Sequence, residues 1–261
     1  MDQFAKLPNA ENDKIQKWNP SDPNSVLIDI SNLHRKVCFQ KANVNVIKVL
    51  GFGISGVVYK ACQYGNCNYA LKVENRSDEK EFLAEIRKGK KAASAGAGPS
   101  IYKYFKCESS AGSLYMIMMD LMDSSLTGFL KKMGNLTITE SKALIAIIEK
   151  LNRAGIIHND LKPDNVGIKL AANGGMIKKF YLIDYGHSVD VSDPPGHDKV
   201  GWTKIPVDRS WIAWWDFLCL LFRIANVNST LSILLRRKIP KLPVKGSKVV
   251  LPNGVLFPIK Y

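Results

Sequence analysis

The octapeptide HNDLKPDN at residues 158–165 concentrates side chains that can do acid–base and ionic chemistry. It holds two aspartates, a lysine, a histidine and asparagines, and apolar segments flank it on both sides. Carboxylates can move protons or hold cations, and a lysine can balance developing negative charge. A solvated turn uses the same residue types. Whether these residues form a site therefore depends on partners elsewhere in the chain.

A glycine pattern suited to phosphate binding lies earlier in the chain. Gly51, Gly53 and Gly56 in GFGISGVV follow the spacing GxGxxGxV. Glycines let a backbone approach phosphate oxygens without a Cβ clash, and Val57 at the start of the next strand can cover a base. The expected strand–turn–strand setting excludes a Rossmann dinucleotide site, in which the turn leads into a helix. A hairpin with a purely structural role has the same pattern, so both interpretations stay open.

A lysine follows within an apolar strand. Lys72 lies in ALKV, where a buried charge without a partner would cost several kcal/mol. It therefore needs an anion, which Glu85 on the following helix or a nucleotide phosphate could supply. Glu81 lies one turn earlier on a similar helix face, and we expect Glu85 to be the partner. The alternative is a strand-edge lysine whose ammonium group reaches solvent.

The elements that must position these residues begin with a β-rich lobe. Residues 44–74 contain three short runs of strand-forming residues, and residues 100–109 and 113–122 predict two more strands. The last of these is nearly all apolar, so we expect both its faces to be buried. Between them, residues 77–95 show the charge pattern and apolar spacing of an amphipathic helix. The first lobe thus has five antiparallel strands and one helix.

From residue 124 onward the pattern becomes helical. Residues 124–133 and 137–155 predict helices, and the second begins with a Thr and Glu capping region. Residues 165–186 predict a hairpin, and residues 210–225 predict a strongly apolar, buried helix. The expected fold class is therefore α+β, with a mostly helical second lobe.

Five motifs together resemble the protein kinase superfamily. GFGISGVV, ALKV, Glu85, HNDLKPDN and IDYG occur in the order and approximate spacing of that family, over residues 46–187. Asp216 in WWDF is similar to the buried helix aspartate of the kinase large lobe. The resemblance implies a bilobal, kinase-like fold that transfers the γ-phosphate of ATP with Mg²⁺, or with Mn²⁺ in its place.

The resemblance implies a role for most of the octapeptide, which would be the catalytic loop. Asp160 would accept or orient the substrate hydroxyl, Lys162 would steady the γ-phosphate, and Asn165 would bind one metal ion. His158 would support the loop. Kinases of the serine/threonine type resemble this DLKPDN, so the implied acceptor is a serine or threonine of a protein.

The other implied catalytic groups lie in the two lobes. Lys72 and Glu85 would form the ion pair that supports the phosphates. Asp184 would be the main magnesium ligand, because hard cations prefer carboxylate oxygens. It opens the metal-binding motif at residues 184–186, in which Tyr185 stands where the family usually has Phe.

The resemblance also implies a nucleotide site formed by the glycine-rich loop at residues 51–56, the strand of Lys72 and the hinge between the lobes. Met119 would be the gatekeeper beside the adenine, and backbone groups of Asp120 and Met122 would bond its edge. A core strand with no ligand would bury the same methionines. The candidates for nucleotide binding are Gly51, Phe52, Gly53, Ile54, Ser55, Gly56, Val57, Ala70, Lys72, Met119, Asp120 and Met122.

The chain departs from the family pattern in three ways. Asn159 replaces the arginine that normally reads a phosphate on the activation loop, so we expect activity without phosphorylation of that loop. Residues 186–216 lack an APE motif, which puts peptide docking in question. Few residues follow Asp216, so we expect a shortened C-lobe whose apolar helix is covered by a partner.

Some features resemble one branch of the kinase superfamily in particular. They are KVE followed by Glu85, AGAGPSIYKYF, KPDN and the long hairpin at residues 165–186. These features look like the casein kinase 1 and vaccinia-related kinase branch. Minimal kinases of this kind are similar to forms encoded by viruses or delivered by bacteria. The resemblance then implies the cytoplasm of a host cell as the location.

Composition predicts an intracellular protein with no membrane span. The 261 residues are 46% apolar, enough for a sizeable core, but no apolar run is long enough to cross a bilayer. Five cysteines without a CxxC pair favour reduced thiols in the cytoplasm. CQYGNC is interpreted as ordinary hairpin cysteines and not as a zinc site.

The formal charge of +14 favours anionic partners. The basic residues are spread along the chain, which fits either a solvated surface or a dedicated patch. We expect a protein substrate and an acidic protein over the shortened C-lobe, and no motif indicates nucleic acid. The expected domains are a mobile arm at residues 1–24, an N-lobe at 25–122 and a C-lobe at 123–261, shortened after residue 216.

Three functions remain to be compared. The leading interpretation is an active, magnesium-dependent serine/threonine protein kinase. A pseudokinase scaffold that binds nucleotide and an acidic partner is the second, although a scaffold has no chemical need for the complete set of phosphoryl-transfer residues. A kinase for a small molecule or lipid is the third, and it requires the altered segment at residues 186–216 to form a closed pocket.

Overall fold

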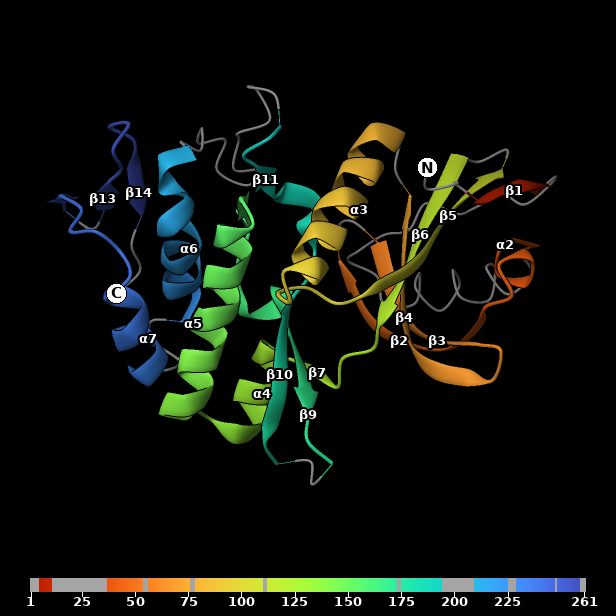
Figure 1. The fold of residues 1–261 in the computed structure, drawn as a ribbon, viewed down its shortest axis with the longest axis horizontal. Helices are drawn as coiled ribbons and strands as arrows, with labels where there is room; N and C mark the ends of the chain where they lie inside the picture. The colour runs from red at the N-terminus through yellow and green to blue at the C-terminus, as the bar shows by residue number, and fades with distance from the viewer. Residues whose placement is uncertain are drawn as a thin grey trace. The chain divides into compact units, whose positions relative to one another are not determined.

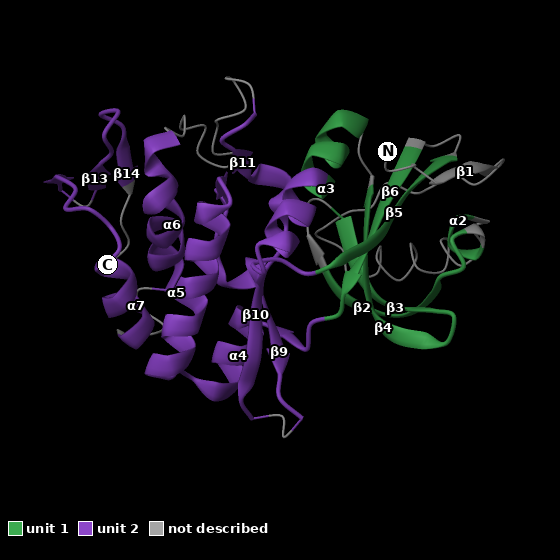
Figure 2. Ribbon diagram, viewed as in Figure 1, with its two compact units in different colours: residues 1–86, 100–121 green, residues 87–99, 122–261 purple. Residues whose placement is uncertain are grey.

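The computed structural model describes residues 5–10, 37–53, 56–75, 78–109, 112–172, 175–193, 209–224, 229–246 and 248–258 (Figure 1). Contacts divide the chain into unit 1, Met1–Ile86 with Ser100–Leu121, and unit 2, Arg87–Pro99 with Met122–Tyr261 (Figure 2). The division passes through helix α3 (Glu79–Ser94), so residues 87–99 group with the second unit. The sequence predicts a single division after residue 122.

Unit 1 is built on one sheet. Five of its strands pair antiparallel, as the sequence predicts. A sixth, Ala5–Ala10, pairs in parallel with Ile101–Ser109, although the sequence predicts a mobile arm over residues 1–24. The strands are β1 (Ala5–Ala10), β2 (Asn45–Gly53), β3 (Gly56–Gln63), β4 (Asn66–Asn75), β5 (Ile101–Ser109) and β6 (Gly112–Asp120), in the order β1-β5-β6-β4-β3-β2.

The strand β6 is buried on both faces, as its apolar sequence predicts. Met116 and Met118 belong to the core on one face of the sheet. Tyr115 and Ile117 point to the other face and pack with Phe82 of α3, whose ring centroid lies 4.7 Å from that of Tyr115. Because the first half of α3 packs on the sheet through these apolar contacts, the side chain of Glu85 is placed at a fixed position relative to β4 and β6.

The cysteines form two disulfides, so the expectation of reduced thiols is wrong. Cys38 in α2 (Val37–Lys41) pairs with Cys107 in β5, and Cys62 pairs with Cys67. Cys219 is buried as a free thiol. Sequence spacing could not show the first pairing, because it depends on how the fold brings together residues 69 positions apart.

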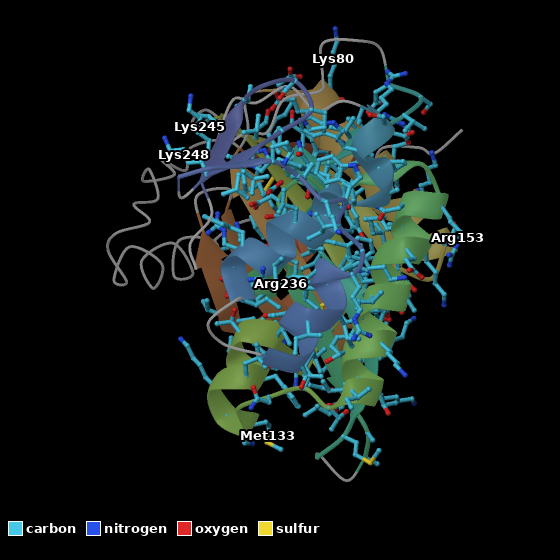
Figure 3. The ribbon with its side chains drawn as sticks, turned by 90° about the vertical axis from the view of Figure 1, so that its left-hand side faces the viewer. Lys80, Met133, Arg153, Arg236, Lys245 and Lys248 are labelled. Carbon is cyan, nitrogen blue, oxygen red and sulfur yellow. A yellow bond between two sulfur atoms is a disulfide. The ribbon has the colours of Figure 1, made fainter. Side chains whose placement is uncertain are left out.

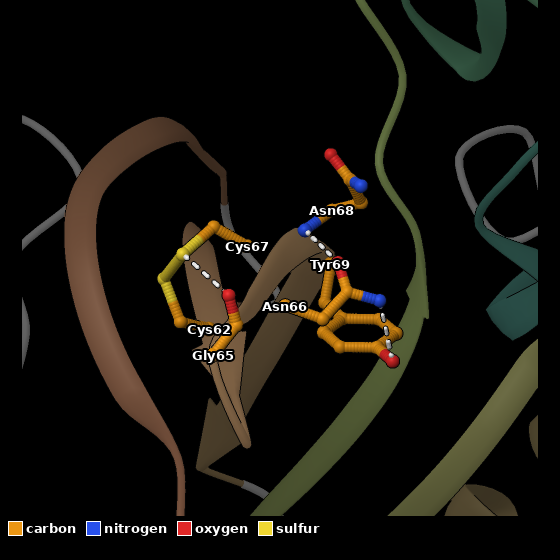
Figure 4. Close-up of a disulfide and its surroundings, with 6 residues drawn as sticks. All are labelled: Cys62, Gly65, Asn66, Cys67, Asn68 and Tyr69. Carbon is orange, nitrogen blue, oxygen red and sulfur yellow. Dashed lines mark hydrogen bonds between the residues drawn. A yellow bond between two sulfur atoms is a disulfide. The ribbon is translucent and has the colours of Figure 1, made fainter.

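The second disulfide closes the hairpin between β3 and β4 (Figure 4). Tyr64 and Gly65 form its two-residue loop, and both have positive φ, at 50° and 80°. Such a loop matches the twist of the flanking strands and brings the residues on either side of it together. The segment CQYGNC is therefore a hairpin, as expected, but a cross-linked one.

Unit 2 combines helices with short strands. The helix from Ile138 begins with the predicted capping box, in which the Glu140 amide donates to Thr137 Oγ1 at 3.2 Å and the Thr137 amide donates to Glu140 Oε2 at 2.9 Å. The predicted hairpin at residues 165–186 is also present, as two antiparallel strands. The helices that follow α3 are α4 (Leu126–Met133), α5 (Ile138–Arg153), α6 (Trp215–Ile224) and α7 (Ser229–Arg236).

The strands of unit 2 form three small sheets. One has the order β10-β9-β7, one pairs β11 with β8, and one has the order β12-β13-β14. Their bounds are β7 (Ser124–Ser125), β8 (Ile156–Ile157), β9 (Val166–Leu170), β10 (Ile177–Leu182), β11 (Val189–Asp190), β12 (Val244–Lys245), β13 (Lys248–Val250) and β14 (Leu256–Pro258).

The apolar helix near the end of the chain is covered within unit 2, which overturns the expectation that it needs a partner. Trp215 and Leu220 of α6 are completely buried. α7 packs against both α5 and α6, and the ring of Phe257 in β14 lies 5.5 Å from that of Trp215. The terminal segment of the chain thus supplies the cover. Among the described residues, no helix combines the length and apolar character that a bilayer crossing requires.

Candidate active site

The glycine-rich pattern forms the end of the hairpin between β2 and β3. Gly53 pairs with Gly56, which has a φ of 155°. A Cβ on Gly56 would lie 2.1 Å from the carbonyl oxygen of Val73 on β4. Only glycine therefore permits this approach of two strands. A Cβ on Gly51 would meet no atom within 4 Å, so local packing does not require glycine there.

The other predicted nucleotide residues of this loop are only partly described. Ile54 and Ser55 lie outside the described residues. Phe52 pairs with Val57 across the hairpin, and Val57 is buried in the core of unit 1. Val57 thus holds the strand that comes after the turn in the core of unit 1.

Lys72 on β4 has two carboxylates around its ammonium group. Its Nζ lies 2.8 Å from Glu85 Oε1 and 2.7 Å from Glu74 Oε1. The side chain of Lys72 is 11% exposed, that of Glu85 5% and that of Glu74 0%. Removing one partner from a buried ion pair typically costs about 3–5 kcal/mol. The helix residue that pairs with Lys72 is therefore Glu85, as expected, and the alternative, Glu81, is exposed.

Sequence reasoning missed Glu74. A signal was present, because Glu74 follows Lys72 by two positions in KVE and alternate residues of a strand share one face. The strand pattern alone could not show that this face is buried. With both carboxylates in place, Lys72 is oriented from its own strand as well as from α3.

The predicted hinge is held mainly through Asp120. Ala70 and Met119 face each other across β4 and β6. The carboxylate of Asp120 accepts hydrogen bonds from the Tyr102 hydroxyl at 2.6 Å and from the Ser100 amide at 2.8 Å. The first of these bonds is the main reason that the pKa of Tyr102 is raised to about 12. The Asp120 amide donates to the Ser100 carbonyl at 3.1 Å, so the Asp120 carbonyl is the better candidate to bond an adenine.

In unit 2, one buried carboxylate holds the octapeptide. Asp216 accepts hydrogen bonds from the amides of His158 and Asn159, at 2.9 and 3.0 Å, and from the side chain of Asn152 at 3.1 Å. Burial raises the pKa of Asp216, and these donors oppose that shift. His158 Nε2 lies 2.9 Å from the Ile183 carbonyl, to which it donates. His158 therefore supports the loop, as expected, by joining it to the segment before Asp184.

Within the octapeptide, Asp160 is oriented by two of its neighbours. Its Oδ2 lies 2.7 Å from Lys162 Nζ and accepts a hydrogen bond from Asn165 Nδ2 at 3.1 Å. Asn165 also donates to the Asp160 carbonyl at 2.9 Å. Asp160 is only 8% exposed. Because both side-chain bonds go to Oδ2, the other carboxylate oxygen is the one suited to accept a proton from a hydroxyl.

Asp184 is placed beside Asn165 by the backbone. The Ile183 amide donates to the Asn165 carbonyl at 3.0 Å, at the end of the hairpin of β9 and β10. The side-chain nitrogen of Asn165 donates to Asp160, so its side-chain oxygen is the atom suited to bind a cation. A carboxylate and an amide oxygen suit Mg²⁺, which takes few ligands from a protein when phosphates and water complete its shell. These two residues therefore fit the predicted metal.

The described residues contain no group of three or more histidine, cysteine or acidic side chains that could hold a metal ion. An all-protein metal cage is thus not formed by the part of the chain that the structure describes.

The residues around the site are tightly packed. The hydroxyl of Tyr185 donates to the Leu182 carbonyl at 2.8 Å, and burial raises its pKa. Met122, the last predicted hinge residue, lies in unit 2, and a Cβ on Gly167 would be 2.7 Å from its Cγ. Asn159 is buried, donates to the His187 carbonyl at 3.1 Å and accepts from Trp215 Nε1 at 2.9 Å.

The predicted residues thus form two sets, each assembled by contacts within its own unit. The set in unit 1 surrounds the glycine turn and the buried lysine. The set in unit 2 surrounds the octapeptide. Unit 1 contains Gly51, Phe52, Gly53, Gly56, Val57, Ala70, Lys72, Glu85, Met119 and Asp120, and unit 2 contains Met122, Asp160, Lys162, Asn165 and Asp184.

Comparisons with known proteins show which family this chain resembles. A family model described as protein kinase domain matches residues 44–213. The chain is 30% identical over 149 residues to the serine/threonine-protein kinase greatwall of Bos taurus and of Mus musculus, and 29% identical over 150 residues to that of Xenopus laevis. These matches cover 55% of the chain but only 16% of the length of each relative.

The contrast between Gly56 and Gly51 gives a matched test of the glycine turn. Gly56→Ala should lower the free energy of unfolding of the protein by about 2 kcal/mol or more and weaken Mg-ATP binding, because Cβ would overlap the Val73 carbonyl. Gly51→Ala should leave stability nearly unchanged. Chemical denaturation and calorimetric titration with Mg-ATP would measure both effects. Equal stability of the two variants would contradict the described strand approach.

Proposed function

Because the chain belongs to the protein kinase family, we propose that it is an ATP- and magnesium-dependent serine/threonine protein kinase. The observation that carries this proposal is the arrangement of Asp160, which is oriented by Lys162 and Asn165 in a buried loop. A loop with no chemical role has no need for a nearly buried carboxylate aimed by a cation and an amide.

The residues of unit 2 would act on the acceptor. Asp160 would orient the substrate hydroxyl and accept its proton as the hydroxyl oxygen bonds to the γ-phosphorus and the bond to ADP breaks. Lys162 would balance the charge of the transferred group. Asn165 and Asp184 would hold magnesium, which supplies charge neutralisation when it is bound.

The residues of unit 1 would bind the nucleotide. Lys72, held by Glu74 and Glu85, would contact its phosphates, while the turn at Gly56 would lie along them. The Asp120 carbonyl and the backbone of Met122 would bond the adenine edge next to Met119. These assignments follow the family motifs residue by residue.

The choice of serine and threonine as acceptors is supported by Lys162 in DLKPDN and by the similarity to greatwall, a serine/threonine-protein kinase. Activity without activation-loop phosphorylation is supported by Asn159. This residue is 0% exposed and bonded to His187 and Trp215. A buried amide with these partners cannot read a phosphate as the usual arginine does.

Transfer of label from γ-labelled ATP, with magnesium, to serine or threonine of casein, histone or myelin basic protein tests the proposal. Asp160→Asn should lower the rate about 100-fold or more, because general-base catalysis contributes at least that factor. Asp164→Asn changes an exposed acid in the same octapeptide and serves as the matched control. Its rate should stay within about two-fold of the unmodified protein.

Retained transfer in Asp160→Asn or Asp184→Asn would overturn the assignment. Thermal stabilisation by Mg-ATP without any transfer would favour the pseudokinase scaffold. Label found in a metabolite, with no labelled protein, would favour a small-molecule kinase.

The C-terminal part of the chain supports the proposal of an acidic protein partner. No aspartate or glutamate follows Asp216. Lys245 on β12 and Lys248 on β13 lie directly opposite each other, and both are exposed, as is Arg236 on α7 (Figure 3). Like charges at opposed strand positions destabilise a sheet. An anionic partner would relieve that repulsion, and exposed Val244 beside them favours a protein over nucleic acid.

The double variant Lys245→Glu with Lys248→Glu tests this surface. It should weaken binding of polyglutamate about ten-fold in low salt, because it reverses both opposed charges. The control is Lys131→Glu with Lys132→Glu at the exposed end of α4, which should bind polyglutamate almost as the unmodified protein does. Fluorescence anisotropy would measure both. Equal weakening in the two variants, or tighter binding of a DNA duplex than of polyglutamate, would contradict the proposal.

The finer predictions from the sequence remain proposals. They are a place in the casein kinase 1 and vaccinia-related kinase branch, a viral or bacterial origin, a cytoplasmic location and the use of Mn²⁺. The two disulfides count against a strongly reducing compartment, where such bonds are rare.

A further inference from the structure

Three basic side chains on the second half of α3 contact the segment that follows the Tyr185 motif. Lys91 Nζ lies 3.0 and 2.9 Å from the two carboxylate oxygens of Asp190. Arg87 donates to Asp190 Oδ2 at 3.3 Å and also to the carboxylate of Asp193. Lys88 Nζ donates to the Ser188 carbonyl. All these contacts lie within unit 2.

Asp190 is the centre of this cluster. It is 1% exposed, and its Oδ1 also accepts bonds from the amide and the hydroxyl of Ser192, at 3.0 and 2.8 Å. Burial alone would raise the pKa of Asp190, but the bonds from Ser192 and Lys91 outweigh it and hold the pKa below its usual value. The group is therefore a charged carboxylate with donors on both oxygens.

The same segment is also fixed to the strand before the catalytic loop. Val189 and Asp190 pair antiparallel with Ile157 and Ile156 in β8. The Val191 amide donates to the Gly155 carbonyl at 2.9 Å. Residues 188–193 are thus held by β8 through their backbone and by α3 through their side chains.

In kinases with an arginine at the position of Asn159, a phosphate on the activation loop supplies negative charge that basic side chains bind. The carboxylate of Asp190 supplies negative charge to basic side chains in the same way. We propose that Asp190, with Arg87 and Lys91, is a positioning cluster that orders residues 188–193 and fixes the rotation of α3 without any phosphorylation. This inference rests on the proposed kinase function.

The link to catalysis runs along α3 itself. The helix is unbroken over Glu79–Ser94, and Glu85 precedes Arg87 by only two positions. A rotation of the helix would move the Glu85 carboxylate from its place 2.8 Å from Lys72 Nζ. We therefore class Asp190, Arg87 and Lys91 as positioning residues, which act through Glu85 and Lys72.

Three variants and one control test the cluster. Asp190→Asn keeps the shape of the side chain and removes its charge, and Lys91→Met removes the main cation. Arg87→Gln changes a side chain that is 49% exposed, so it puts the fold at least risk. The control, Glu149→Gln, breaks an ion pair of 2.6 Å with Lys238 elsewhere in unit 2.

The expected result is a fall in kcat of about 100-fold for Asp190→Asn and Lys91→Met, because small misplacements of catalytic groups have effects of that size. The kcat of Arg87→Gln should fall less, and the kcat of the control should stay within about two-fold of that of the unmodified protein. The double variant Asp190→Asn with Lys91→Met should be no slower than the slower single variant, since both remove one interaction. The protein treated with phosphatase should keep its full kcat.

Hydrogen exchange separates this inference from the proposed function. Without nucleotide, the amides of residues 87–94 and 188–193 should exchange faster in all three cluster variants than in the unmodified protein. In Glu149→Gln their exchange rates should not change. Faster exchange in a protein that transfers no phosphate would leave the cluster standing and overturn the kinase proposal. Three results would each overturn the proposed role of the cluster. They are unchanged exchange in the cluster variants, additive losses of kcat in the double variant, and a loss of kcat after phosphatase treatment.

Discussion

The buried carboxylate of Asp216 is the interaction on which the site in unit 2 depends. It accepts two backbone amides from the octapeptide and a side-chain amide from α5, with no exposure to water. These buried amide donors cannot bond to solvent instead. Any arrangement of the loop that breaks their bonds to Asp216 is therefore unfavourable. The bond from His158 to the Ile183 carbonyl then extends that order to the segment before Asp184. The residues that would handle the acceptor and the metal are thereby positioned before any ligand binds.

Charge in this molecule is used in two different ways. Lys72, Glu85, Arg87 and Lys91 are satisfied by partners inside their own units, and several of these partners are completely or nearly buried. These groups stabilise particular positions of α3 and β4. Lys245 and Lys248 lie instead on the surface, opposed to each other, and no acidic residue follows Asp216 in the sequence. The net charge of +14 therefore combines basic groups paired inside the structure with basic groups exposed on its surface.

The family resemblance pointed to the pairing of Lys72 with Glu85, which joins a strand to a helix 13 positions along the chain. Local patterns predicted the five antiparallel strands, the amphipathic helix α3 and the capped helix α5. Each of these depends on periodicity or on neighbours along the chain. The sequence did not predict β1, the disulfide of Cys38 with Cys107, or the cover of α6 by the terminal segment, because each joins distant parts of the chain. The cluster around Asp190 was hidden for the same reason. Its lysines stand in KGKK, which resembles a solvated basic run until the fold supplies the carboxylate.

The most direct test of this account is the kcat of Asp216→Asn, measured with saturating Mg-ATP and casein beside Asp164→Asn. The side-chain amide that this substitution introduces would be a poorer acceptor for the buried donors, at a cost of about 1–3 kcal/mol for each bond lost. A folded Asp216→Asn protein whose kcat falls about 100-fold is the expected result, because the groups that would handle the acceptor and the metal lose their positions. An unchanged kcat in Asp216→Asn would contradict the claim that this carboxylate positions the catalytic loop.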